Sequence, residues 1–187
     1  MRATRKEIDL TGGAAARGEF DRALDAMSSV KLPTVVDIGA NTAASLLTVI
    51  GGLAQEFAAA GVEFGILVVS TADAGALADA PKLLALAAPF VTAKFLVANR
   101  LAPMFEKKPF VEIAQGATIS YLLNKIMEEP AAEILRAGGL APIPYLDPSN
   151  LSEKFGFSLG GRVHGDLTSF RLEVMESVRA AAEWLIG

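Results

Sequence analysis

The sequence predicts one α/β domain whose core is a mostly parallel sheet with helices on both faces, a three-layer arrangement. Three runs of apolar and β-branched residues, 34–39, 62–70 and 92–99, have the composition of buried strands. Helical segments of about ten residues or more alternate with these runs, as in the βαβ units of an open parallel sheet. The 187 residues fit a single domain, 1–187.

Composition excludes several kinds of site. Hydrophobic residues make up 52% of the chain and charged residues 20%, so a disordered chain is excluded. The net charge of −4 argues against bulk attraction to nucleic acid or an anionic membrane, and there is no direct nucleic-acid signature. With no cysteine and one histidine, disulfides, thiolate sites and histidine clusters are excluded. The N-terminus leads into Glu7 and Asp9, and no apolar run reaches about 18 residues, so we expect a cytoplasmic protein without a transmembrane segment.

The elements of the first half follow from periodicity and from the residues that end each segment. They are irregular chain over 1–18, a helix over 19–29, a strand over 34–39, a helix over 42–60, a strand over 62–70 and a helix over 76–88. The helix over 42–60 ends at Gly61, because glycine readily adopts the left-handed conformation that commonly follows a helix. Pro81 either interrupts the next helix or marks a later start.

The second half carries more glycine and proline between its apolar segments. The expected elements are a strand over 92–99, irregular chain over 101–109, a short edge strand over 110–113, helices over 120–127 and 130–137, at best an edge strand over 140–146, a loop over 149–165 and an amphipathic helix over 166–186. Gly138 and Gly139 end the helix over 130–137, and Asp166 is the expected N-cap of the last helix.

The first candidate site residues lie at the end of the strand over 34–39, because ligands of open parallel sheets bind at the carboxyl ends of the strands. Asp37 ends this strand, and a carboxylate there can hold Mg²⁺ through water. Gly39 lets the backbone approach a phosphate closely. The alternative is that Asp37 caps the next helix or pairs with a buried base, although Asn41 and Thr42 can cap that helix without it.

The other two strand ends also carry polar side chains. Asn99 precedes Arg100, and its carboxamide offers one acceptor and two donors, which suits the edge of a purine. The alternative is an asparagine that forms a turn after a strand. The segment 70–75 offers further polar groups to the same crevice, and its Asp73 is equally a candidate helix cap.

These segments, in this order, resemble the ParA/MinD group of deviant Walker P-loop ATPases. The group includes plasmid-partition ATPases and relatives encoded beside plasmid mobilisation genes. Residues 35–42 resemble its second nucleotide motif, and 66–71 resemble the following core strand. Residues 96–100 resemble its base-side strand, and 142–145 resemble its late segment beside the base. The resemblance covers about residues 30–187.

The resemblance implies ATP and Mg²⁺ as cofactors. Asp37 is then the catalytic residue and the metal ligand, and Asn99 reads adenine. The cofactor-binding residues that it implies are Gly39, Asn41, Asn99, Arg100 and Pro144.

The chain departs from the group's pattern at its N-terminus. The group begins with a strand, a glycine-rich loop and a lysine, which offset the charge of the phosphates. Here the early pair Gly12 and Gly13 is followed by alanines, with no Gly-Lys-Ser or Gly-Lys-Thr. We therefore expect a P-loop NTPase-like fold that lacks the Walker A segment and is N-terminally truncated. The strand that would be missing is central in the parent sheet, and unpaired strand edges invite dimerisation.

The leading interpretation is a ParA/MinD-like nucleotide-binding-type domain with impaired catalysis. It would act in plasmid or chromosome partition, or in mobilisation, through nucleotide-linked contacts as a homodimer or with a protein partner. The alternative is a non-catalytic scaffold that dimerises or docks a partner through the sheet edge or the last helix. A third interpretation, a small-molecule enzyme of flavodoxin-like shape, has no evident catalytic constellation.

Overall fold

The structure, a computed structural model, describes residues 22, 24–28 and 32–187. Its elements, in chain order, are α2 (Ala40–Gly52), α3 (Ala54–Ala59), β1 (Phe64–Ser70), α4 (Ala74–Ala87), β2 (Val91–Leu101), α5 (Lys108–Ile113), β3 (Thr118–Leu123), α6 (Glu129–Gly138), the 3₁₀ turn η1 (Ile143–Tyr145), α7 (Pro148–Phe155), α8 (Phe157–Ser177) and α9 (Arg179–Ile186). Residues 24–28 are also helical, as expected of the helix over 19–29, whereas the expectation for 1–18 lies outside the described residues.

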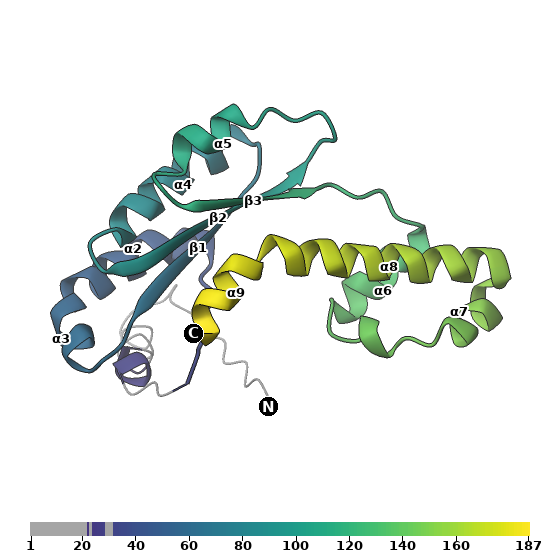
Figure 1. The fold of residues 1–187 in the computed structure, drawn as a ribbon, viewed down its shortest axis with the longest axis horizontal. Coiled ribbons are helices and arrows are strands. Elements are labelled where there is room, and N and C mark those ends of the chain that lie inside the picture. The colour runs from purple at the N-terminus through teal and green to yellow at the C-terminus, as the bar shows by residue number, and fades with distance from the viewer. Residues whose placement is uncertain (1–21, 23, 29–31) are drawn as a thin grey trace.

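Three strands form one parallel sheet in the order β1-β2-β3 (Figure 1). The registers bring Val68 beside Leu96 and Leu96 beside Ile119, so these three side chains share one face. The α/β class and the parallel sheet predicted from the sequence are therefore confirmed, with β1 and β2 at the predicted runs 62–70 and 92–99.

Helix α4 closes one face of the sheet, which we call the covered face. Val68 and Leu96 pack there against Ala80 and Leu84, and neither Leu84 nor Leu96 has any exposed surface. Pro81 lies inside α4 without ending it. The covered face is thus a closed apolar layer, as parallel sheets require.

Helix α9 covers only part of the opposite face. The Trp184 ring lies over Gly65, where an added Cβ would come within 2.5 Å of it, and over Phe95 at 6.3 Å between ring centroids. Farther along β1, Leu67 and Val69 point to this same side and are 42% and 58% exposed. We call these two residues the open strip.

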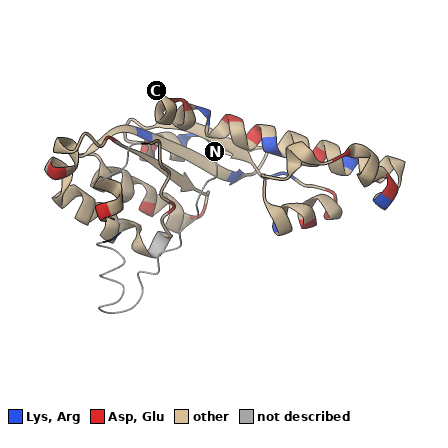
Figure 2. Ribbon diagram, turned by 90° about the horizontal axis from the view of Figure 1, so that it is seen from below, with Lys and Arg blue, Asp and Glu red and all other residues tan. Residues whose placement is uncertain are grey.

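A helical lobe formed by α6, η1, α7 and the first half of α8 lies beside the sheet (Figure 1). Its own core is built from Ala131, Ile143, Leu151, Val163 and Leu167. Helices α7 and α8 approach so closely that a Cβ on Gly160 would lie 2.6 Å from the carbonyl oxygen of Leu151. Charges of both signs are spread along α8 (Figure 2). In the described part of the chain, no helix is both long and apolar enough to span a bilayer.

The predicted strand over 34–39 is wrong. This segment is irregular chain that leads into α2, and Val35 and Val36 are 80% and 46% exposed. A β-branched run forms a strand only where a neighbour completes its hydrogen bonds, and no described strand pairs with it. The predicted helix over 42–60 is confirmed with a break at Leu53, and Gly61 follows it with φ 74°.

Two predictions between β2 and α6 are also wrong. Residues 110–113, expected to be an edge strand, belong to α5, whose first turn holds Pro109. The expected helix over 120–127 is replaced by β3, which pairs in parallel with β2. Ile119 and Tyr121 face the covered side and alternate with Ser120 and Leu122, so pairing with β2 decides the structure of this apolar run.

The C-terminal region is more helical than predicted. The helix over 130–137 is confirmed, and Gly139 follows it with φ 61°. Residues 140–146 contain η1 rather than an edge strand, and the expected loop over 149–165 forms α7 and the start of α8. Asp166 is therefore inside a helix and not at its N-cap, and its carboxylate accepts a hydrogen bond from the Glu128 amide at 2.8 Å.

Candidate functional site

The candidate site is the carboxyl edge of the sheet, where the three parallel strands end together. β1 reaches this edge at Ser70, β2 at Leu101 and β3 at Leu123. The backbone amide of Asn124 donates to the Leu101 carbonyl at 2.8 Å, which ties the ends of β2 and β3 together. Polar groups that follow these strands are therefore neighbours along one edge.

Asn99 and Arg100 form an irregularity near the end of the central strand β2. The pairing of β2 with β3 shifts register between Ala98 and Leu101, and Arg100 has φ 55°. Asn99 is half-buried, and its Oδ1 accepts a hydrogen bond from the Arg100 amide at 2.8 Å. Asn99 therefore lies inside β2, and the alternative that it forms a turn after a strand does not apply.

The Asn99 amide nitrogen keeps its two hydrogen-bond donors, since no described group accepts from it. The Arg100 side chain is exposed and forms no ion pair with a described residue. The arrangement can therefore offer two amide donors and one cation to a ligand at the carboxyl edge.

The segment after β1 is held by a local hydrogen bond. Thr71 Oγ1 donates to Asp73 Oδ2 at 2.5 Å, while the Asp73 amide approaches Thr71 Oγ1 at 3.4 Å. Asp73 occupies the N-cap position of α4, as expected, but its side chain makes no cap hydrogen bond. Its carboxylate is thus directed to Thr71 rather than to the helix amides.

Asp37, Gly39 and Asn41 lie outside the sheet. Asp37 is exposed on irregular chain, so the argument that parallel strands bring it to the same edge as Asn99 does not apply. Gly39 is the N-cap of α2, and its carbonyl accepts from the Thr42 amide and hydroxyl at 3.0 Å each. Asn41 lies in the first turn of this helix, so the cap expected at Asn41 and Thr42 is at Gly39 instead.

Pro144 lies in η1, within the helical lobe and not on a strand. It is exposed, as is Tyr145, and η1 packs against α8 through Ile143. The structure therefore brings Asn99 and Arg100 together at the carboxyl edge, and it places Asp37, Gly39, Asn41 and Pro144 on other elements.

An aromatic cluster closes the covered face near the carboxyl edge. Phe110 is buried, and the rings of Phe105 and Tyr121 lie 5.2 Å apart between centroids. The Lys107 ammonium lies 5.2 Å from the centre of the Tyr121 ring, a cation–π distance. Sequence reasoning missed Tyr121 because it assigned this residue to a helix.

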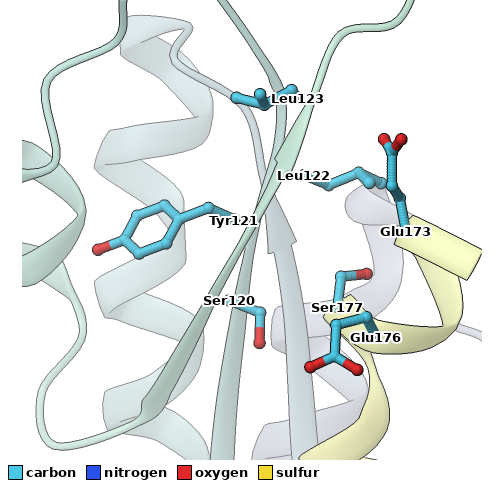
Figure 3. Close-up of a pocket in the computed structure, with 7 residues that line it drawn as sticks. All are labelled: Ser120, Tyr121, Leu122, Leu123, Glu173, Glu176 and Ser177. Atoms are coloured by element: carbon cyan, nitrogen blue, oxygen red, sulfur yellow. The ribbon is translucent and has the colours of Figure 1, made fainter. Parts of the chain in front are cut away.

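A cavity of about 400 Å³ lies between β3 and α8 (Figure 3). Ser120 and Leu122 face it from the strand, and Glu173, Glu176 and Ser177 face it from the helix. Its charges already have partners: Lys125 pairs with Glu173 at 3.2 Å, and Arg179 pairs with Glu176 at 2.9 Å. The Ser177 hydroxyl donates to the Val174 carbonyl, so all three polar side chains that α8 contributes to this cavity have partners within the protein.

The described residues fit the purine base of the implied nucleotide better than they fit its Mg²⁺. Among the described residues, no group of three or more histidine, cysteine, aspartate or glutamate side chains could hold a metal ion. Asp37 is thus a single exposed carboxylate, and the site does not fit a protein-held Mg²⁺. The free amide donors of Asn99 fit the ring-nitrogen acceptors of a purine.

Comparisons of the chain with protein-family models, with curated proteins and with solved structures found no match.

Proposed function

We propose that this protein is an α/β domain of the ParA/MinD type that acts through protein contacts, in plasmid or chromosome partition or in mobilisation, and has little ATPase activity of its own. The observation that carries the proposal is Asn99, half-buried at the carboxyl end of the central strand with two free amide donors. This is the strand end to which the resemblance assigns adenine reading.

The chemistry at Asn99 suits a purine base. The hydrogen bond from the Arg100 amide fixes one end of the carboxamide, which leaves the NH₂ group to donate to a ring nitrogen. A preset side chain loses less conformational freedom when a ligand binds. The exposed Arg100 beside it supplies a positive charge that an anionic nucleotide requires.

The phosphate end of such a site has far less support. The sequence contains no Gly-Lys pair, and Asp37 stands away from any acidic cluster in the described chain. Phosphoryl transfer depends almost entirely on positioned cations and backbone amides around the phosphates. We therefore assign binding of the base to this chain and no hydrolytic step.

Isothermal titration calorimetry with Mg-ATP tests the proposal. We expect micromolar binding that Asn99→Ala weakens by about three- to tenfold, the value of one hydrogen bond. Asn124→Ala is the matched control, because that exposed residue uses its backbone amide, not its side chain, to bond Leu101. No heat at millimolar nucleotide, or equal loss in both asparagine variants, would contradict the proposal.

A second candidate function is a non-catalytic interaction scaffold, and the open strip favours it. A parallel sheet has both faces covered in nearly all folds, yet Leu67 and Val69 are 42% and 58% exposed. Exposed apolar groups on an unpaired strand edge mark a surface for association. In the same titration, a folded protein that gives no nucleotide heat but self-associates or binds a protein would favour this candidate.

A further inference from the structure

The outer edge of β1 is unpaired in the described structure. β1 pairs only with β2, and no backbone hydrogen bond from another described segment reaches its other side. Its sequence from Phe64 to Ser70 has no charged residue and no proline. Natural edge strands usually carry such residues to prevent association, and β1 carries none on the edge that no described strand occupies.

The open strip lies on this unprotected edge. Leu67 and Val69 share one face of β1 with Gly65, over which Trp184 is seated. The apolar surface therefore continues from the Trp184 ring along the strand and ends in solvent at Val69, which is 58% exposed. A strand added at this edge extends the ladder and covers the strip at the same time.

We propose that the occupant is β1 of a second copy of this chain, paired antiparallel about a two-fold axis at Leu67. The proposal rests on the protein contacts of the proposed function and does not require nucleotide. In this register Leu67 lies opposite its own counterpart, and Gly65 lies opposite Val69 of the second copy. Directly opposed residues of antiparallel strands point to the same face, so all of these side chains meet on the open side.

The residue pattern of β1 is compatible with its own reverse, as an isologous interface demands. The smallest side chain, at Gly65, is opposite the exposed Val69 of the other copy, so a bulky group meets a small one. The Trp184 ring above Gly65 then covers that Val69. Glu63, the charge that precedes β1, lies opposite the neutral Thr71, so no like charges oppose each other along the edge.

Light scattering on the full chain, without nucleotide, tests the mass in solution. We expect twice the mass of one chain at tens of micromolar, and we expect Val69→Lys to raise the dimer dissociation constant at least tenfold. Val111→Lys is the matched control, because Val69 and Val111 are each 58% exposed and Val111 lies on α5, away from the edge. A monomeric wild-type chain, or equal effects of both lysines, would overturn the proposal.

Cross-linking tests the register and does not depend on a charged variant that folds poorly. The chain has no cysteine, so Leu67→Cys introduces one thiol per copy. Only a residue on the two-fold axis opposes itself, so mild oxidation should join the Leu67→Cys copies and leave Val111→Cys monomeric. Failure of Leu67→Cys to cross-link above the Val111→Cys level also overturns the register proposed here.

The single tryptophan gives a third readout. Since Val69 of the second copy covers Trp184, quenching of its fluorescence by acrylamide should fall as the protein concentration rises, and this change should be absent in Val69→Lys. The calorimetric result for nucleotide is independent of these measurements. A dimer without nucleotide binding retains this inference alone, and a monomer that binds Mg-ATP retains the proposed function alone.

Discussion

Two neighbouring residues of β1 have opposite environments although both are valine. Val68 points to the covered face and is 7% exposed, whereas Val69 points to the other side and is 58% exposed. The difference comes from their neighbours, because α4 lies over Val68 while α9 reaches only the start of β1 at Gly65. Strand composition thus specifies two buried faces, and the described part of the chain leaves the second face open along β1, although Phe95 and Val97 of β2 are buried on it. The other face is where association should be sought.

The largest expected effect is a loss of stability when a buried residue of the covered face is truncated. We expect Leu84→Ala to lower the free energy of unfolding by about 2–5 kcal/mol, because it removes buried methyl groups and leaves a cavity against Val68 and Leu96. Urea denaturation followed by circular dichroism measures this loss. Leu86→Ala on the same helix is the control, since Leu86 is 38% exposed and should lose less than about 1 kcal/mol. Equal losses would mean that α4 does not seal this face.

The sequence predicted β1 and β2 correctly because a buried strand next to a long helix has a distinctive pattern, an apolar run that follows a helix-ending residue. Within the run 62–70, residues 64–69 carry no polar side chain, and Gly61 marks where the preceding helix ends. The same reasoning failed at 34–39, where an equally β-branched run has no described neighbour to pair with and lies exposed. Local composition indicates that a segment can form a strand, but whether it does depends on a neighbouring strand that pairs with it.

The candidate site was predictable to the same extent. Asn99 and Arg100 lie near the carboxyl edge because they are among the last residues of β2, whose run was correctly predicted. Asp37 was expected at the end of a strand over 34–39 that the described structure lacks, and it lies on irregular chain. Pro144 was named through the resemblance alone, and it lies in the helical lobe. The open strip could not be predicted, because the sequence pattern of an apolar strand is the same whether or not a helix covers each of its faces.

A smaller loss of stability is expected from a substitution at Gly65, where the Trp184 ring covers the start of β1 on the side opposite α4. An added Cβ would lie 2.5 Å from the Trp184 ring, so Gly65→Ala forces the ring or α9 to move. We expect a loss of about 1–3 kcal/mol of stability, with a change in tryptophan emission as the ring becomes exposed. Gly75→Ala in α4 has nothing within 4 Å of its added Cβ and should be neutral or stabilising by about 0.5–1 kcal/mol. An unchanged emission and stability in Gly65→Ala would show that Trp184 is not held over β1.

The smallest expected effect is that of Val69→Ala, and it tests directly whether Val68 and Val69 have different environments. In dilute solution Val69→Ala should change the free energy of unfolding by less than about 0.5 kcal/mol, because its methyl groups are exposed in the single chain. Val68→Ala, one residue earlier, should cost about 1–3 kcal/mol at any concentration. If a second copy covers the open strip, the cost of Val69→Ala rises with protein concentration, because burial is then coupled to association. Thermal denaturation of both variants at micromolar and at hundreds of micromolar concentrations separates the cases. A cost of Val69→Ala that matches Val68→Ala even in dilute protein would mean that the chain itself covers both faces, and that the open strip is not a surface.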